Sequence, residues 1–273
     1  MKKYSFLVFI CTALVMAFTI VPKEKPILYL IGDSTVDDGS GNNGLWGWGK
    51  FLHEFIDTNK MSIRNYAQGG TSARTFFTGG IWDKKINKRG MWDTVSIKMK
   101  KGDYLLIQFG LNDQGRIDDT ARARGTLKGI GDTGVTIYNA VTKQIETVHS
   151  FGWYLRQFIQ QAKVKGVTVI MCSSIPKNEW KEGELIRGEK GFADWALQVA
   201  EQEKVCSIDL NSLVADVYDR DGIDIVTNKY HIPTDKTHTT KDGALLNASI
   251  VAQGLLTLKN CMTNDFIKKL LKN

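Results

Sequence analysis

Apolar and polar positions form blocks along the chain, and the blocks differ in period. Five short runs are apolar almost throughout, which is typical of strands buried on both faces of a sheet. They span residues 27–31, 63–67, 104–109, 167–172 and 205–210. Between them, apolar residues recur at helical spacing in segments 47–55, 82–99, 151–165, 191–203 and 241–258. Strands that alternate with helices predict right-handed βαβ units and a parallel sheet.

The pattern therefore predicts an α/β fold: one domain, residues 24–273, built as a three-layer α/β/α sandwich around a five-stranded parallel sheet. We expect the flavodoxin-like strand order 2-1-3-4-5, counting strands along the chain. Two segments interrupt the alternation, residues 110–150 and 222–240. Connections of this length are usually functional. Ligands bind at the carboxyl ends of parallel strands, so we expect the reactive groups at that edge.

The amino-acid composition is typical of a single globular domain and gives little further information. The chain has 273 residues, of which 42% are hydrophobic and 24% charged, enough for a packed core. The formal net charge of +7 suits an acidic partner, and it equally suits ordinary solubility. The sequence contains no arginine-rich run or aromatic-interleaved basic stripe, so we expect no nucleic-acid partner.

The amino terminus resembles an export signal. Lys2 and Lys3 precede an apolar stretch from Tyr4 to Ile20, so residues 1–20 are expected to be a signal peptide. A membrane anchor is the alternative, but the apolar run is short for a span. We expect a protein exported to the periplasm or the medium, without stable membrane insertion, and a monomer.

Three cysteines follow the signal region: Cys172, Cys206 and Cys261. Their wide spacing and odd number do not define a pairing. Cys172 and Cys206 fall in predicted buried strands, where we expect them to act as small apolar core residues. No spacing is typical of a zinc site, and no metal is expected.

A serine, a histidine and an aspartate stand at positions that suit nucleophilic catalysis. Ser34 follows the first predicted strand, and Asp235 precedes His238 by three residues near the other end of the chain. A serine hydroxyl needs a neighbouring base and a group that orients the base. A serine after a turn is also a common helix cap. The Asp-x-x-His pair favours the catalytic interpretation, with Ser34 as nucleophile, His238 as base and Asp235 as its partner.

Two further positions suit the stabilisation of an oxyanion. Gly70 follows the second predicted strand and offers a backbone N–H, and Asn112 follows the third and offers an amide side chain. With the N–H of Ser34, they make a candidate oxyanion hole. Ordinary turn geometry also accounts for the glycine and the asparagine.

Together these short motifs resemble the four blocks of the SGNH (GDSL-type) hydrolase superfamily. Gly-Asp-Ser, a glycine, Gly-x-Asn-Asp and Asp-x-x-His appear in order across nearly the whole chain. The resemblance implies the flavodoxin-like SGNH-hydrolase fold and an esterase. It also implies a catalytic triad of Ser34, Asp235 and His238 and an oxyanion hole of Ser34, Gly70 and Asn112. The reaction that the resemblance implies passes through an acyl-enzyme and needs no cofactor.

A closer resemblance is to the rhamnogalacturonan acetylesterases, a carbohydrate esterase family. Residues 65–76, 147–156, 175–180 and 235–239 carry it. The resemblance implies removal of acetyl groups from an acidic pectic polysaccharide of the plant cell wall. One departure is Leu111, where the family has a histidine. It keeps two alternatives open: an impaired carbohydrate-binding protein on the same fold, and an acetylxylan or general acyl esterase. An esterase acting on lipids is a weaker third, since no lid-like apolar helix is apparent.

Two other residues are candidates for substrate contact. Arginine pairs with uronate carboxylates, and aromatic rings stack on sugars. Arg74 and Trp180 lie in or near the motif loops, so we expect both to bind substrate.

Overall fold

The structure, a computed structural model, describes residues 24–39, 44–79, 91–187, 191–258, 260–262 and 264–268. Within this part the chain forms a five-stranded sheet in the order β2-β1-β3-β6-β9. Every neighbouring pair in it is parallel. The strands are β1 (Ile27–Gly32), β2 (Ser62–Asn65), β3 (Tyr104–Gln108), β6 (Thr168–Cys172) and β9 (Cys206–Ile208). The predicted order 2-1-3-4-5 is confirmed.

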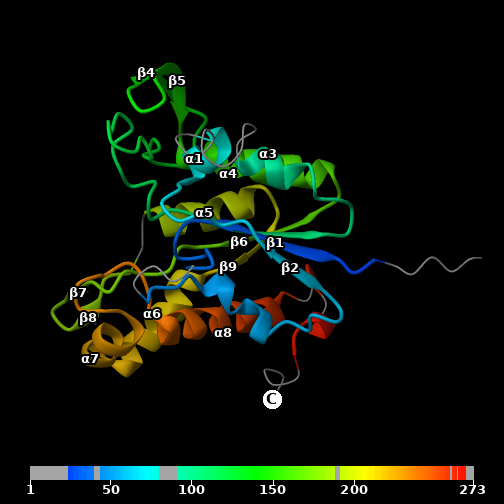
Figure 1. The fold of residues 1–273 in the computed structure, drawn as a ribbon, viewed down its shortest axis with the longest axis vertical. Helices are drawn as coiled ribbons and strands as arrows, with labels where there is room; N and C mark the ends of the chain where they lie inside the picture. Colours follow the sequence, from blue (N-terminus) through cyan, green and yellow to red (C-terminus); the bar gives the residue numbers. More distant parts are fainter. Residues whose placement is uncertain are drawn as a thin grey trace, which may run out of the picture.

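Helices cover both faces of this sheet (Figure 1). One layer holds α1 (Ala73–Thr78), α3 (Met91–Ser96), α4 (Phe151–Val164) and α5 (Phe192–Gln202). The other holds α6 (Leu210–Asp221) and α8 (Lys241–Thr257). Alternate strand residues point to opposite layers: Tyr29 and Ile31 belong to the first apolar core, and Leu28 and Leu30 to the second. The central strands β1, β3 and β6 are largely apolar because both of their faces are buried, whereas the edge strands β2 and β9 are more polar and more exposed. The α/β/α fold is confirmed.

Shorter elements lie in the connections. They are the 3-10 helices η1 (Trp48–Lys50), η2 (Leu52–Glu54) and η4 (Asn264–Phe266), the helix α7 (Ile223–Ile225), the π-helix η3 (Val226–Tyr230), the antiparallel pair β4 (Gly134–Asn139) and β5 (Gln144–His149), and the antiparallel pair β7 (Trp180–Lys181) and β8 (Glu184–Leu185). The β4–β5 hairpin occupies part of the predicted 110–150 connection and projects from the layered body (Figure 1).

Two helix predictions differ from the structure, and one helix was not predicted. Segment 47–55 forms η1 and η2 instead of one α-helix. There, a Cβ at Gly49 would lie 2.2 Å from the carbonyl oxygen of Val36, so the chain follows a tight path against the strand-one loop. Of the predicted helix 82–99, residues 82–90 lie outside the described residues, and α3 covers part of the rest. The sequence analysis missed α6, although Leu210, Val214 and Tyr218 bury one helical stripe.

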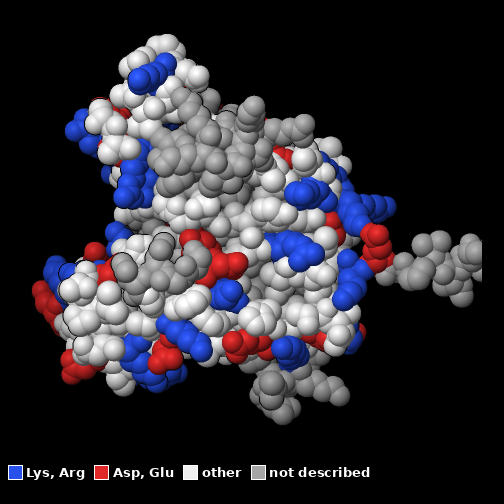
Figure 2. Space-filling model, in the orientation of Figure 1, with Lys and Arg blue, Asp and Glu red and all other residues white. Residues whose placement is uncertain are grey.

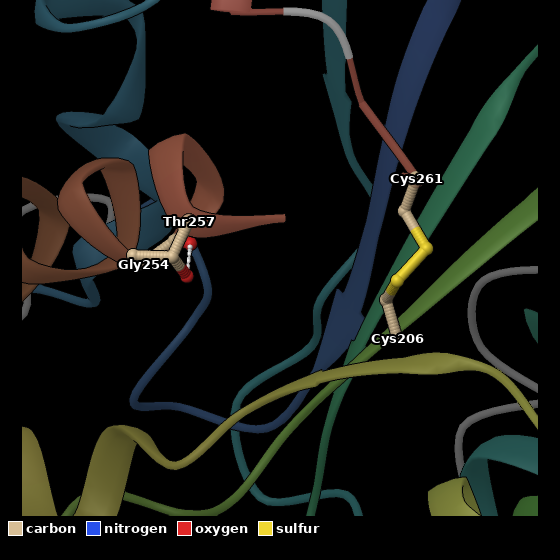
Figure 3. Close-up of a disulfide and its surroundings, with 4 residues drawn as sticks. All are labelled: Cys206, Gly254, Thr257 and Cys261. Carbon is tan, nitrogen blue, oxygen red and sulfur yellow. Dashed lines mark hydrogen bonds between the residues drawn. A yellow bond between two sulfur atoms is a disulfide. The ribbon is translucent and has the colours of Figure 1, made fainter. Parts of the chain in front are cut away.

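The prediction for Cys206 was wrong. Cys206, the first residue of β9, forms a disulfide with Cys261, which follows α8, and their Cα atoms are 6.4 Å apart (Figure 3). Cys172 is the buried free thiol that the sequence predicted. The pairing is a long-range contact between a strand and a C-terminal turn, so the spacing of the cysteines did not reveal it.

Figure 2 shows basic and acidic side chains interspersed over one face rather than gathered into a patch of one sign. No helix in the described ranges is long and apolar enough to cross a membrane. Across the same ranges, no group of three or more His, Cys, Asp or Glu side chains is placed to hold a metal ion.

Candidate active site

A cleft of about 740 Å³ opens at the carboxyl ends of the strands. The loops after β1, β2 and β3 contribute Ser34, Gly70 and Asn112 to it, and the late insert contributes Asp235 and His238. The described residues that line the cleft are Ser34, Asp37, Gly39, Leu45, Trp46, Gln68, Gly69, Gly70, Leu111, Asn112, Arg122, Arg124, Lys177, Asp235, Thr237 and His238. All five residues predicted for the triad and the oxyanion hole therefore meet at one edge of the sheet.

Ser34, His238 and Asp235 form a continuous hydrogen-bonded chain. The Nε2 atom of His238 lies 2.9 Å from Ser34 Oγ, although the two residues are 204 positions apart. The Nδ1 atom of His238 lies 2.7 Å from Asp235 Oδ2. A carboxylate only accepts, so Nδ1 carries the hydrogen and Nε2 is the free acceptor for the serine hydroxyl. This tautomer is the one that a general base requires.

The Asp235 carboxylate is held in the ionised state by its neighbours. Burial raises its pKa, but the backbone N–H groups of His238 and Thr237 and the imidazole of His238 outweigh burial, so the pKa lies below the ordinary value. The two N–H groups donate to Asp235 Oδ1 at 2.9 and 2.8 Å. Oδ1 of Asp235 therefore accepts hydrogen bonds from its own loop, and Oδ2 accepts one from the imidazole. The carboxylate remains charged at neutral pH.

His231 supports His238 from below. It is fully buried, its Nδ1 lies 2.9 Å from the carbonyl oxygen of His238, and its Nε2 lies 3.1 Å from the hydroxyl of Tyr218. Burial lowers the pKa of His231 to about 4, so it is neutral at physiological pH. The sequence offers no signal for His231, because no aspartate precedes it by three residues. Its place beneath the catalytic loop depends on the packing of α6 against η3.

The loop of His238 is also tied to the first strand's loop. The backbone N–H of Trp46 donates to the Thr239 carbonyl at 2.9 Å, and the Thr239 hydroxyl donates to the Trp46 carbonyl at 2.8 Å. A second tie links the N–H of Asn178 to the carbonyl of Lys236 at 2.8 Å. These bonds hold the loop of His238 beside the loop that follows β1. They thereby keep His238 in contact with Ser34.

The three residues that carry the predicted oxyanion donors, Ser34, Gly70 and Asn112, line the same cleft. The backbone N–H groups of Ser34 and Gly70 have no acceptor within the described part of the chain. Gly70 has φ +83°, a conformation that favours glycine and turns its peptide at the end of the strand-two loop. Asn112 Nδ2 donates one hydrogen to the Thr71 carbonyl at 2.7 Å and keeps a second hydrogen.

Two buried carboxyl groups brace these loops. Asp113 accepts the N–H groups of Ala73 and Gly110, each at 3.1 Å, which ties the start of α1 to the end of β3. Asp33 accepts the N–H and the hydroxyl of Thr35 at 2.9 and 2.8 Å. Burial raises the pKa of Asp33 to about 6, and burial with the nearby charge of Asp33 raises the pKa of Asp113.

The two residues predicted to bind substrate do not line the cleft. Arg74 is fully buried, and its guanidinium is bound by Glu146 at 2.8 and 2.7 Å. It therefore serves the packing of α1 against the β4–β5 hairpin, and the prediction of a substrate contact is wrong. The indole N–H of Trp180 donates to Asn178 at 2.6 Å, and the ring packs against the second apolar core. Trp180 is absent from the described cleft lining.

Sequence reasoning missed other residues of the cleft. Arg122 and Arg124 enter it from the 110–150 connection, and Asp37 enters from the strand-one loop. The available signal was weak: two arginines one residue apart, soon after the strand-three motif, in a connection already expected to be functional. The direction in which each arginine side chain points depends on how the 110–150 connection folds. The local sequence pattern does not contain that information.

A nucleophile–base–carboxylate chain with oxyanion donors at the edge of a parallel sheet defines the class of serine hydrolases. Comparison with known proteins names the particular family. Residues 30–244 match the GDSL-like lipase/acylhydrolase family, and the chain belongs to it. It is accordingly a carboxylic ester hydrolase.

Relatives cover most of the chain. It is 30% identical over 235 residues to a rhamnogalacturonan acetylesterase of Emericella nidulans, covering 86% of this chain and 84% of that protein. It is 25% identical over 245 residues to a probable rhamnogalacturonan acetylesterase, YesY, of Bacillus subtilis, covering 89% of this chain and 98% of that protein. The crystal structure of Bacillus subtilis YXIM superposes with a TM-score of 0.65 at 25% identity, covering 86% of this chain and 57% of that one.

Proposed function

We propose that this protein is a serine acetylesterase that removes O-acetyl groups from plant cell-wall polysaccharide, with acetylated rhamnogalacturonan as the substrate. The observation that carries the proposal is the pair of short hydrogen bonds, 2.9 and 2.7 Å, that link Ser34 to His238 and His238 to Asp235. This geometry activates an otherwise weak serine nucleophile and requires no metal or organic cofactor.

The proposed reaction has two halves. Ser34 Oγ attacks the acetyl carbonyl while His238 Nε2 takes the hydroxyl proton, and the resulting oxyanion accepts hydrogen bonds from Ser34 N–H, Gly70 N–H and Asn112 Nδ2. The C–O bond to the sugar breaks, and the sugar hydroxyl leaves with the proton from His238. Water then attacks the acetyl-serine ester, His238 takes its proton and returns it to Ser34 Oγ, and acetate leaves.

The lining of the cleft supports a sugar acid as substrate. Arg122 and Lys177 carry positive charge into the cleft, and Trp46 exposes part of its ring there. Guanidinium and ammonium groups pair with uronate carboxylates, and an aromatic ring offers an apolar face to a sugar. The names of the similar proteins from Emericella nidulans and Bacillus subtilis support the same substrate class.

We further propose that the protein is exported and acts as a monomer. The charged and apolar pattern of residues 1–20, which lie outside the described residues, supports export. The disulfide between Cys206 and Cys261 supports it as well, because disulfides form and persist in oxidising compartments.

Replacing the proposed nucleophile tests the activity. Ser34→Ala should lower kcat on p-nitrophenyl acetate by at least about 10³-fold, because the acetyl-enzyme cannot form. Ser249→Ala on α8 is the matched control, since its hydroxyl only donates to the Leu246 carbonyl. Equal rates for Ser34→Ala and wild type, with both proteins folded by circular dichroism, would end the proposal.

A panel of acetylated polymers tests the substrate. We expect acetate release from acetylated rhamnogalacturonan to exceed release from acetylated xylan and from simple acyl esters in kcat/KM. Leu111 lines the cleft and motivates the alternative of a protein that binds carbohydrate without turnover. Labelling of Ser34 by a fluorophosphonate would exclude that alternative, and polymer binding without labelling or acetate release would favour it.

A further inference from the structure

We propose that Arg124 is a positioning residue of the oxyanion hole, which orients and polarises the Asn112 amide and anchors the Gly70 loop. Its Nη1 atom donates to Asn112 Oδ1 at 2.6 Å and to the Gly70 carbonyl at 3.2 Å. One guanidinium nitrogen therefore joins the two segments that follow β2 and β3. The inference rests on the oxyanion hole of the proposed function.

Arg124 permits only one orientation of the Asn112 amide. Asn112 Nδ2 donates to the Thr71 carbonyl at 2.7 Å, while its Oδ1 accepts from Arg124. A carbonyl only accepts and a guanidinium only donates, so a flipped amide would place like groups against each other at both ends. The second Nδ2 hydrogen is then available for the oxyanion, and the amide need not reorganise during the reaction.

The same contact makes Asn112 a stronger donor. A hydrogen bond from a charged guanidinium draws electron density toward Asn112 Oδ1 and increases the positive charge on the Nδ2 hydrogens. Arg124 is half-buried, and none of the ion pairs among the described residues includes it. Burial and the like charge of Arg122 lower the pKa of Arg124 below its usual value, which still leaves it protonated at neutral pH.

The backbone on either side of Arg124 is fixed. Ala123 has φ +48°, the left-handed region that an alanine rarely adopts. A Cβ at Gly125 would lie 2.1 Å from the Gly115 carbonyl oxygen, so only glycine fits there. The Gly125 carbonyl accepts from the buried Arg74 at 2.8 Å. Arg74 thus helps to hold Arg124 at the cleft instead of contacting substrate itself.

Substitution of Arg124 tests the inference with a substrate that carries no charge. On p-nitrophenyl acetate, Arg124→Met should lower kcat by about 10- to 100-fold with little change in KM, a smaller loss than removal of an oxyanion donor itself. Arg124→Lys should restore only part of kcat, because an ammonium lacks the fork of donors. Arg116→Met is the control from the same connection, since the Arg116 side chain is 81% exposed and pairs only with Asp118.

Two further measurements separate positioning from a loss of fold. Guanidinium at millimolar concentration should raise the kcat of Arg124→Ala, which a misfolded variant would not allow. In an Asn112→Ala background, Arg124→Met should cost less than about 3-fold, because only the longer contact with the Gly70 carbonyl then remains for Arg124 to supply.

Three results would overturn the inference. The first is an unchanged kcat of Arg124→Met on p-nitrophenyl acetate together with a raised KM on acidic polymer alone. The second is that guanidinium fails to raise the kcat of folded Arg124→Ala. The third is that Arg124→Met lowers kcat by the same factor in the Asn112→Ala background as in wild type. The first would reassign Arg124 to substrate carboxylate binding. If Ser34→Ala is inactive while one of these three results is obtained, only the role of Arg124 is contradicted, and the proposed function is not.

Discussion

Asp33 stands one residue before the candidate nucleophile, yet its carboxyl group is fully buried. Its Oδ1 accepts two bonds from Thr35, and its Oδ2 has no hydrogen-bond partner in the described part of the molecule. Burial raises its pKa from 3.8 to about 6. Between these two values the folded protein keeps a proton that the unfolded chain releases, so the stability that Asp33 contributes falls as the pH rises through this window.

A substitution that removes the charge of Asp33 should prevent the loss of stability at higher pH. Asp33→Asn keeps the acceptor for Thr35, so it should match wild type in thermal stability near pH 4 and exceed it above pH 7. The gain is at most about 3 kcal/mol, since each pKa unit corresponds to about 1.4 kcal/mol. Thermal unfolding of both proteins from pH 4 to 8 measures it.

The comparison must use the difference between variant and wild type at each pH. His231 titrates in an overlapping window with the opposite sign, because its pKa is lowered to about 4 and its neutral form is the folded one. Asp224→Asn, an exposed aspartate, controls for the change in net charge. A difference that does not grow with pH would show that Asp33 is not a buried acid with a raised pKa.

At the scale of elements, the β4–β5 hairpin is attached to α1 through one ion pair. Glu146 on β5 binds Arg74 on α1 through both carboxylate oxygens, and Asn139 on β4 donates to the same carboxylate at 2.6 Å. Several hydrophobic side chains of the hairpin are exposed, among them Ile145 at 70%. The hairpin therefore depends on this polar contact more than on an apolar core of its own.

Removal of only one partner of the Arg74–Glu146 ion pair should lower the stability of the fold. Glu146→Ala leaves the buried Arg74 charge without its partner and should lower the free energy of unfolding by about 3 kcal/mol. The double substitution Arg74→Met with Glu146→Met should cost less, because it removes both charges. Urea unfolding gives the values, and Glu201→Ala on the exposed side of α5 is the control. A double variant less stable than Glu146→Ala would contradict this account.

At the scale of the whole molecule, the disulfide connects the last strand of the sheet with the turn after the last long helix (Figure 3). Cys206 opens β9, so the bridge lies at the amino end of that strand, and the cleft lies at the carboxyl ends. The bridge closes a loop of 55 residues, and cross-links of this length act mainly on the unfolded chain.

Loss of the bridge should affect stability and spare catalysis. Cys206→Ala with Cys261→Ala should lower the free energy of unfolding by about 2–4 kcal/mol while kcat on p-nitrophenyl acetate stays unchanged at 25 °C. Thermal unfolding with and without dithiothreitol measures the first, and a rate assay the second. The reductant should destabilise wild type and leave the double variant unaffected. A large fall in kcat in the folded variant would mean that the bridge also positions the site.

The sequence determined the elements and the chemistry. Apolar runs predicted the five strands, and the helical stripes predicted α4, α5 and α8. The strand order was predicted from the fold class that this alternation indicates. The four motifs identified Ser34, Gly70, Asn112, Asp235 and His238, which meet in the cleft. These features could be predicted because period, turn residues and short motifs are local, and the carboxyl ends of parallel strands share one edge.

The tertiary structure alone decided which long side chains reach the cleft. Arg74 and Arg124 are both arginines close to the motifs in sequence, yet one binds Glu146 in the interior and the other binds Asn112 at the cleft. The pairing of Cys206 with Cys261 was likewise decided by packing. Such contacts join residues far apart in the chain, and their free energy depends on burial and on the partner present, neither of which a local pattern contains.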